Sequence, residues 1–454
     1  MKRGKTAMKR ILSFLLCCGL LLCLLCSCAG NNIQSGKALD GEGLSGTLRG
    51  YCYQGTGYAN RLKEFEKANP QLELNLTTFQ NPSAFAKQVA LDAEAGTLPD
   101  FILCDTFSDL NLLQLQKQGY LLDLSSYLAS EDSFRAEDYF FSAFEGCRQG
   151  ESLYLLPLSL GMPLVYTTQE KQEERGLVIP ENYDAPELFL TLSNHIQELS
   201  ASADEKELAC MQLPAEGNPL SLLHGLGLSL WDWKTGQVAE LQPEQIQPAL
   251  EFSLSMYQGM DRAVDLLWGG NWNRALSLTS LLTVAAERAT FLLDGGYLYS
   301  PEQLQLLLSA YDMRGETLLS YPIPAAGTRL EDQQYGAELI SYGAVFAQSQ
   351  NPVAAYTLLR TLQQQKTGSD ISYGVSVNRA AAKAQFGKYQ DSPQIEAILS
   401  YFDHGVVTLY ETTSLYESLA QVLAAYQSGG DFQSFLDQVM NRAEVYLTAP
   451  PEDA

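Results

Sequence analysis

Apolar and polar positions follow two alternating periods in the part of the chain that begins near residue 47. Segments 47–53, 72–76 and 101–104 fit strands, because their apolar residues alternate or form a short continuous run. Segments 58–68 and 82–96 fit helices, the second opened by a proline and closed by a glycine. This β-α-β-α-β order predicts an α/β fold in which a mostly parallel sheet is covered by helices.

Beyond about Pro157 the alternation weakens and helical spacings dominate. Segments 321–325 and 340–346 fit extended chain, and Pro352 opens another helix. Two helical apolar faces, separated by the pair Gly429-Gly430, close the chain. The 454 residues, 46% of them apolar, are enough to build two domains.

The N-terminus carries an export pattern. Five Lys and Arg residues precede an uncharged apolar run at 11–25, which is typical of a secretory signal peptide. As a helix this run would rise about 22 Å, short of the ~30 Å hydrocarbon core, so a permanent membrane span is the weaker interpretation.

The stretch Leu25-Cys26-Ser27-Cys28-Ala29-Gly30 resembles the bacterial lipobox, in which the cysteine after a small residue becomes the lipidated first residue. Cys28 fits that position, whereas Cys26 directly follows a leucine. We therefore expect a lipoprotein signal peptide at 1–27, acyl chains such as palmitate on Cys28, and a flexible tether at 28–45. Cleavage by an ordinary signal peptidase, without lipid, is the alternative.

Composition narrows the possible partners. Asp and Glu number 53 against 29 Lys and Arg, a net charge of −24, so nucleic acid is a poor partner. Only four cysteines follow Cys28, too few for a disulfide scaffold, although a single bridge stays open. We expect no metal and no cofactor.

Three short stretches, 64–70, 95–100 and 119–124, follow one another in a familiar order and spacing; they read EFEKANP, AGTLPD and GYLLDL. They resemble the sugar-type (family 1) extracellular solute-binding proteins that feed ABC importers, and further similarities continue through nearly all of the mature chain. Departures from the family pattern, which concern the ligand more than the fold, stand at Thr167-Thr168, Glu287-Arg288 and Gly296-Tyr297.

That resemblance implies a two-lobe periplasmic-binding-protein-like fold (type II), with hinged lobes and a central cleft. Crossings between lobes are expected near Pro157, Gly343 and Ser392. The expected lobes are 46–156 plus 344–391, and 157–343 plus 392–454.

The resemblance also implies a function without turnover. A membrane-anchored monomer on the extracellular face of the cell membrane would capture a carbohydrate between its lobes and deliver it to ABC importer permease subunits. Lobe closure on the solute would create the form that the importer recognises.

A sugar site needs aromatic rings against the C–H face of the sugar, with carboxylates or amides that fix its hydroxyls. The four Trp residues form two pairs beside Asp and Asn, and other candidates follow strand ends, where ligands of parallel sheets bind. The alternative for each is a core aromatic or an ordinary loop residue. The predicted ligand-binding residues are Tyr53, Gln54, Asp105, Trp231, Asp232, Trp233, Trp268, Asn271, Trp272, Tyr297 and Tyr342.

A surface-anchored glycan-degrading enzyme is the alternative from another class. Its two carboxylates cannot be singled out among 53 acidic residues, and the sequence lacks the G-x-S-x-G and H-E-x-x-H motifs. His195, His224 and His404 are far apart in the chain and do not suggest a catalytic or zinc group. A structural lipoprotein, or a solute-binding homologue with a non-sugar ligand or none, is the third possibility.

Overall fold

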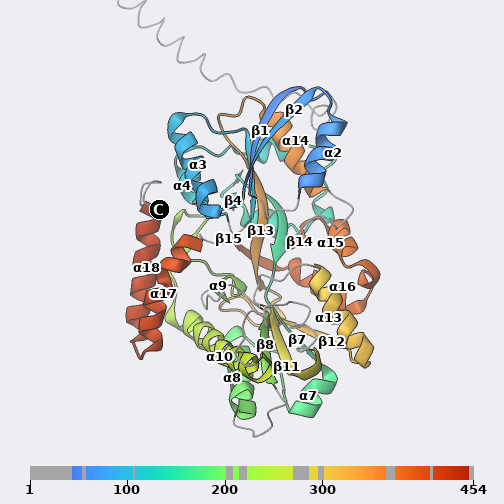
Figure 1. Cartoon of the computed structure of the whole chain (residues 1–454), viewed down its shortest axis with the longest axis vertical. Helices are drawn as coiled ribbons and strands as arrows, with labels where there is room; N and C mark the ends of the chain where they lie inside the picture. The colour runs from blue at the N-terminus through green and yellow to red at the C-terminus, as the bar shows by residue number, and fades with distance from the viewer. Residues whose placement is uncertain are drawn as a thin grey trace, which may run out of the picture.

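The computed structural model of the protein describes residues 43–53, 58–105, 108–200, 208–213, 222–268, 286–294, 301–364, 374–409 and 413–448. Two β-sheets lie toward opposite ends of the long axis of the molecule, each with helices on its faces (Figure 1). The predicted signal peptide and Cys28 lie outside the described residues. Within the described ranges, no helix is both long and apolar enough to cross a bilayer.

The first sheet is mixed. Strands β1, β2 and β3 are parallel, as the sequence predicts, but β13 enters beside β3 in the opposite direction because the chain returns to this sheet from the second one. β15 pairs with the first half of β13. The strand order is β14 (Val375–Ser376), β6 (Leu156–Gly161), β13 (Tyr335–Val345), β3 (Phe101–Asp105), β1 (Gly46–Tyr53) and β2 (Leu72–Phe79), with β15 (Gly405–Leu409) on β13.

Helix α3, which covers the first sheet, begins and ends where the sequence places its signals. In α3 (Pro82–Ala95), the side chain of Asn81 accepts a hydrogen bond from Ala84 N at 2.8 Å, and Gly96 ends the helix at a φ of 67°. The other helices beside this sheet are α2 (Ala59–Ala68), α4 (Leu112–Lys117), α5 (Ser125–Ala129), α6 (Ser142–Gly146), α14 (Pro352–Gln363) and α15 (Arg379–Gln385). Helix α16 (Pro393–Phe402) contacts both β13 and a strand of the second sheet, β12 (Leu318–Pro322).

The second sheet is smaller. Strands β11 and β8 are parallel, and β7 runs antiparallel to both β11 and β12. One face packs on α8 and α10 through a separate apolar cluster that includes Phe189, Phe252 and Phe291. The elements are β12 (Leu318–Pro322), β7 (Leu164–Thr168), β11 (Ala289–Asp294), β8 (Leu208–Leu213), α7 (Gln169–Arg175), α8 (Ala185–Ser200), α10 (Pro243–Trp268) and α13 (Pro301–Arg314).

The chain passes between the sheets at two points near their facing ends. Only Met162 and Pro163 separate β6 from β7, and the segment 323–334 leads from β12 back to β13. By sheet pairing, β6 and all of β13 belong with the first sheet. The predicted lobe boundaries describe which parts move together, and they stay a prediction.

A short helix, α9 (Leu222–Gly225), packs directly on β13. A Cβ on Gly336 would come within 2.1 Å of the carbonyl oxygen of Gly225, so this contact requires the absence of a side chain. The helix thereby carries His224 onto the junction between the two sheets.

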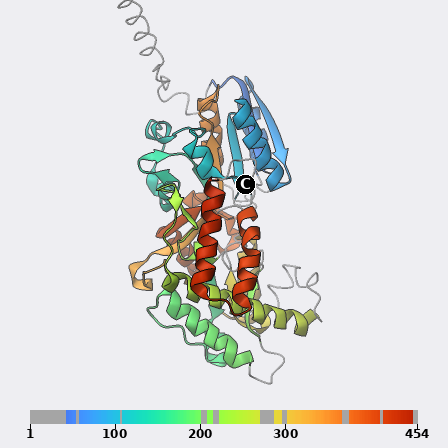
Figure 2. The same cartoon turned by 90° about the vertical axis from the view of Figure 1, so that its left-hand side faces the viewer.

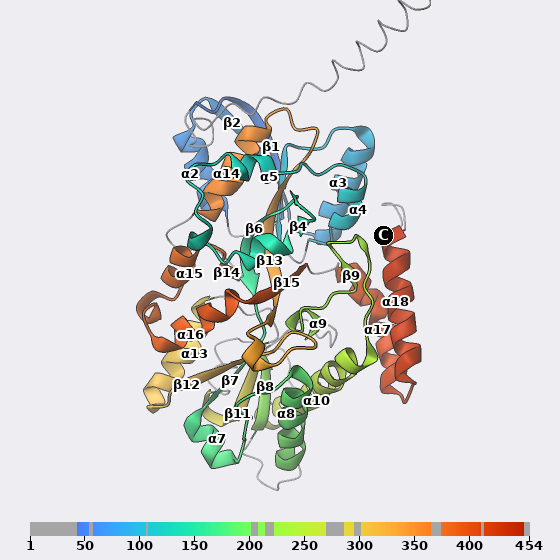
Figure 3. The same ribbon diagram turned by 180° about the vertical axis from the view of Figure 1, so that it is seen from behind.

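The last two helices, α17 (Thr413–Gln427) and α18 (Phe432–Thr448), pack against each other along one side of the molecule (Figure 2). The end of α18 lies beside α4 of the first sheet and the hairpin of β9 (Trp231–Asp232) and β10 (Gln237–Val238) (Figure 3). Asn111 Nδ2, at the start of α4, donates to the carbonyl of Tyr446 at 3.4 Å. The C-terminal helix therefore contacts parts of the chain that are distant in sequence.

Candidate functional site

The carboxyl ends of β1 and β3 place two predicted residues on neighbouring strands. Tyr53 is the last residue of β1 and is half-buried, and Asp105 is the last residue of β3 and only 1% exposed. Both strands point toward the second sheet, so this edge is where a ligand of an α/β sheet binds.

Three hydroxyl groups gather beside Asp105. Ser341 of β13 pairs with Asp105 on one side and with Ser159 of β6 on the other. The Oγ atoms of Ser341 and Ser159 lie 2.6 Å apart, and Tyr58 Oη lies 3.2 Å from Ser341 Oγ. Burial, together with the charge of Asp105, raises the pKa of Tyr58, so its phenol stays protonated and can donate. Ser159, Ser341 and Tyr58 are not among the predicted ligand-binding residues, because no pattern in the sequence singles them out.

Tyr342, also predicted, lies on the next position of β13. Its Oη is 3.3 Å from Ser108 Oγ, in the segment that follows β3. Burial, the thiol of Cys104 and the charge of Asp105 raise the pKa of Tyr342 well above its usual value. The structure therefore brings Tyr53, Asp105 and Tyr342 to one end of the first sheet.

A second carboxylate lies at the facing end of the second sheet. Asp294 is the last residue of β11, is 5% exposed, and pairs with Leu164, which follows β6 closely in the chain. Burial, and then the charges of Asp294 and Tyr401, raise the pKa of Tyr166, which lies on the same face. The strand-end rule that selects Asp105 also fits Asp294, but the strand that carries Asp294 lies beyond Pro157, where the alternation that predicts strands weakens.

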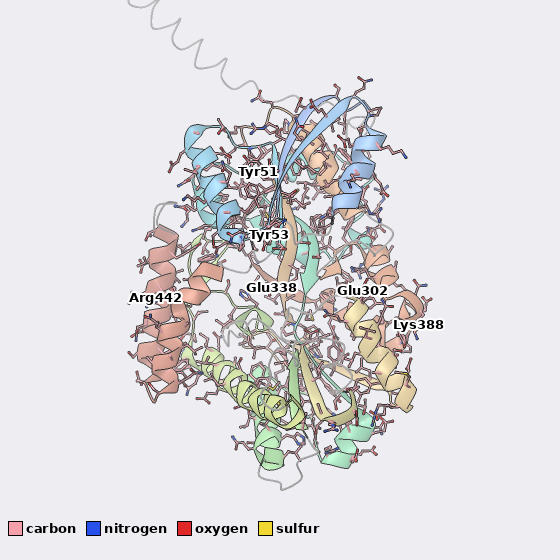
Figure 4. All side chains as sticks on the ribbon, viewed as in Figure 1. Tyr51, Tyr53, Glu302, Glu338, Lys388 and Arg442 are labelled. Atoms are coloured by element: carbon pink, nitrogen blue, oxygen red, sulfur yellow. The ribbon has the colours of Figure 1, made fainter. Side chains whose placement is uncertain are left out.

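Glu338 and His224 lie at the junction of the two sheets. In Figure 4 Glu338 is on β13, nearer than Tyr53 to the second sheet, and its side chain is 4% exposed. His224 Nδ1 lies 3.0 Å from Thr408 Oγ1, and Thr408 Oγ1 donates to the carbonyl of Ala337 at 3.2 Å. The Thr408 hydroxyl therefore bridges the imidazole of His224 and the backbone of β13.

The predicted Trp231, Asp232 and Trp233 lie apart from these strand ends. Trp231 stacks on Tyr446 of α18, with ring centroids 5.8 Å apart and an interplanar angle of 17°, and both Trp residues are 5% exposed. Asp232 accepts from Lys234 N at 2.8 Å, which stabilises the hairpin turn. In this conformation the three residues have structural contacts, and their role in ligand binding stays a prediction.

Four predicted residues, Gln54, Asn271, Trp272 and Tyr297, lie outside the described residues, and Trp268 ends α10 with a side chain that is not described. No group of three or more His, Cys, Asp or Glu able to hold a metal lies within the ranges that are described.

The chain is similar to known proteins both in sequence, over part of its length, and in fold. The profile of the family "Bacterial extracellular solute-binding protein" matches residues 54–193. The Multiple sugar-binding protein of Streptococcus mutans serotype c (strain ATCC 700610 / UA159) is 25% identical over 169 residues. That match spans 37% of this chain and 35% of the relative, so the chain matches about a third of the relative's length.

Solved structures share the fold over most of the chain. The sugar-binding protein MalE from Xanthomonas citri has a TM-score of 0.59 and 17% identity, covering 88% of this chain and 97% of its own. The extracellular solute-binding protein family 1 from Alicyclobacillus acidocaldarius has a TM-score of 0.56 and 13% identity, covering 89% and 99%. The GacH receptor of Streptomyces glaucescens has a TM-score of 0.53 and 18% identity, covering 89% and 98%.

These similarities confirm the predicted fold and the predicted resemblance. The chain has the two-lobed α/β fold of type II periplasmic binding proteins, and it is similar to extracellular solute-binding and sugar-binding proteins.

Proposed function

We propose that the protein is a solute-binding protein that captures a carbohydrate between its two lobes and delivers it, unaltered, to an ABC importer. The observation that carries this proposal is that each of the two sheets ends in a buried carboxylate on the side that faces the other sheet, Asp105 in the first and Asp294 in the second. The similarity to sugar-binding proteins supports the choice of solute.

The chemistry of the strand ends suits a polyhydroxylated solute. Carboxylates accept hydrogen bonds from sugar hydroxyls, and such charge-assisted bonds are stronger than neutral ones. Protonated phenols and serine hydroxyls, as at Tyr58 and Ser341, can donate or accept and so fit several hydroxyl positions. Tyr53 and Tyr342 would supply aromatic surface for the C–H face.

A solute that contacts both carboxylates favours the state in which the sheets approach. Asp105 belongs to the first sheet and Asp294 to the second, so such a solute binds a closed form better than an open one and shifts the population toward it. Within this proposal the lobes are 46–156 plus 344–391 and 157–343 plus 392–454.

The proposal includes attachment to the membrane. Cys28 would carry the acyl chains, and residues 28–45 would tether the protein to the outer face of the cell membrane, raising its concentration near the permease. Incorporation of an alkyne-tagged palmitate that is lost in Cys28→Ala tests this part, with Cys26→Ala as the matched control. Equal labelling of both variants would contradict it.

The binding function is tested by thermal unfolding of the purified protein with a panel of neutral oligosaccharides. A solute at one hundred times its dissociation constant adds about 2.7 kcal/mol to the free energy of unfolding. Chromatography of the same mixtures should return the sugar unchanged. Release of shorter products would instead favour a glycan-degrading enzyme, and the absence of any shift would favour a homologue with another ligand or none.

A further inference from the structure

Strand β2 forms one edge of the first sheet. It pairs with β1 on one side, and no strand among the described residues pairs with its other side. In Figure 2, β1 and β2, drawn in blue, lie at one side of the molecule. An unpaired strand edge offers a row of backbone N–H and C=O groups to another strand. Five of the eight side chains of β2 are exposed, those of Glu73, Asn75, Leu76, Thr77 and Thr78.

The sequence of this edge, LELNLTTF, has little of the protection that edge strands usually carry. It contains no proline and no lysine. Its one charged residue is Glu73, which accepts a hydrogen bond from Thr47 Oγ1 of β1 at 3.3 Å. A strand with a single charge contrasts with a chain of net charge −24. The edge is therefore suited to pairing with a further strand.

Leu76 is the unusual residue at the centre of this edge. Its side chain is 36% exposed, whereas Leu72 and Leu74, on the same face, are 3% exposed and half-buried. Its partner on β1 is Gly50, where a Cβ would come within 2.2 Å of the ring of Phe101. Leu76 thus has no side chain directly opposite it on β1, and an apolar partner on a neighbouring strand can come only from the outer side.

The strand is complementary to an antiparallel copy of itself. With a two-fold axis between the Leu76 residues of two copies, leucine lies opposite leucine, and Asn75 lies opposite Thr77 on the other face. The two Glu73 carboxylates then lie six residues apart along the pair, about 20 Å at ~3.4 Å per residue. That separation exceeds the Debye length of about 8 Å at physiological salt, so the two charges hardly repel.

We propose that β2 is a homodimerisation edge, at which two copies of this protein join their first sheets through an antiparallel β2–β2 pair. Such an interface is isologous and closes after two copies. One strand pair makes a small interface, and the net charge of −24 on each copy opposes association. We therefore expect a weak dimer that is favoured by higher ionic strength. The proposal goes beyond solute binding and differs from the monomer expected from the family resemblance.

The register is tested by disulfide cross-linking of the full chain, purified in mild detergent. Asn75→Cys and Thr77→Cys, mixed and oxidised, should give a linked dimer, because this register places the two positions opposite each other. Either variant alone should give about fivefold less, since its cysteines are offset by two residues. The cysteines that the structure describes are buried, and the wild-type chain sets the background from the others. Val178→Cys, at a position that is 76% exposed, is the matched control and should give that background when mixed with Asn75→Cys.

Leu76→Lys provides a second variant, because it places like charges opposite each other on the two-fold axis. In sedimentation velocity, the wild-type chain should shift toward the dimer as NaCl rises from about 50 to about 500 mM. Leu76→Lys should associate at least tenfold more weakly. Leu190→Lys, on α8 and 62% exposed, is the control and should associate as the wild type does.

Two results would overturn the dimer. One is a mixture of Asn75→Cys and Thr77→Cys that cross-links no more than the Val178→Cys control, or that links to a protein of another mass. The other is a wild-type chain that stays monomeric at every salt concentration. Sugar affinity should be the same in Leu76→Lys and the wild type, so failure of the dimer leaves the proposed function intact.

Discussion

Two buried charged sites lie at the first sheet and its covering helices, and they differ in the groups that surround the charge. Glu131 and Arg360 form a closed pair, in which Arg360 Nε donates to Glu131 Oε2 at 2.7 Å and Nη2 donates to Oε1 at 2.8 Å. Asp105 instead ends a strand, among the hydroxyls of Ser341 and Tyr58. Burial alone therefore does not identify a site.

The groups around the Glu131–Arg360 pair leave it little capacity for further hydrogen bonds or charge contacts. Tyr356 Oη donates to Glu131 Oε2 at 3.0 Å, and the guanidinium lies 5.2 Å from the ring centroids of both Phe134 and Tyr139. Arg360 and Glu131 are 3% and 4% exposed. The pair fixes α14 to the segment after α5. A buried charge that is satisfied within the fold is expected to stabilise it, whereas the strand-end carboxylate of Asp105 is where we propose that solute binds.

Breaking the closed pair should have the largest effect on stability. Arg360→Met leaves Glu131 buried without its cation and should lower the free energy of unfolding by about 3–5 kcal/mol in urea titrations. The double variant Glu131→Leu/Arg360→Met should recover most of that loss. Lys383→Met, which removes an exposed partner of Asp391, is the control and should cost less than about 1 kcal/mol. If Arg360→Met had only a small effect on the free energy of unfolding, the Glu131–Arg360 pair would not differ from Asp105 as a stabilising group.

The same pair predicts a dependence on pH. Burial acts to raise the pKa of Glu131, but the hydrogen bonds and charge of Arg360 outweigh it and leave the pKa below its usual value. The stabilising contribution is therefore fully present above the unfolded pKa of about 4.3 and is lost as the pH falls through the folded value. The double variant should show a flatter stability curve in that acidic range.

Trp231 tests whether an aromatic predicted to bind solute has a structural role instead. Trp231→Ala removes a buried ring stacked on Tyr446 and should lower the free energy of unfolding by about 3 kcal/mol. Trp231→Phe keeps an aromatic ring and should cost about half as much. If Trp231→Ala kept the full free energy of unfolding but lost sugar affinity, Trp231 would be a ligand-binding residue and not a structural one.

Substitution of Asp105 should lower sugar affinity and leave stability almost unchanged, which is the opposite of the effect expected for Arg360. Asp105→Asn keeps the shape but removes the charge, so affinity for the bound sugar should fall about 10- to 100-fold, or about 1.5–3 kcal/mol. The free energy of unfolding without sugar should change by less than about 1 kcal/mol. Asp294→Asn provides the matched variant on the other sheet, and calorimetry should give a loss of the same size. If Asp105→Asn lowered the free energy of unfolding but left sugar affinity unchanged, Asp105 would have a structural role like that of the Glu131–Arg360 pair.

The ends of helices and strands could be predicted from the sequence more completely than the side-chain contacts between them. Pro82, Asn81 and Gly96 define α3 through local hydrogen bonds and backbone conformation, so its ends could be predicted from neighbouring residues. Ser159 and Ser341 appear in the sequence only as single hydroxyls within apolar strands. Their contact depends on β13 entering between β6 and β3, an order that local patterns do not encode.

The same limit applies to the predicted ligand residues. Asp105 could be predicted from the sequence because it directly follows a recognisable strand, and ligands of parallel sheets bind at the carboxyl ends of the strands. The burial of Trp231 depends on Tyr446, which comes from the last helix of the chain. A cluster of Trp and Asp in the sequence is compatible with a sugar platform and with a packed hairpin, and only the tertiary contacts separate the two.

His195 represents a third way of burying a titratable group, and it should give the smallest effect. It is 4% exposed in the second lobe, and its Nε2 has no hydrogen-bond partner among the residues that the structure describes. Burial lowers its pKa, with Glu198 opposing and Arg175 adding to the shift. Since the unfolded histidine titrates near 6.5, stability should be greatest above that pH and should fall as the pH is lowered through it. His195→Phe should reduce this slope in urea titrations between pH 7.5 and 5.5, whereas His404→Gln, at an exposed position, should keep it. An unchanged slope in His195→Phe would show that the buried imidazole is satisfied in the folded protein, as Glu131 is.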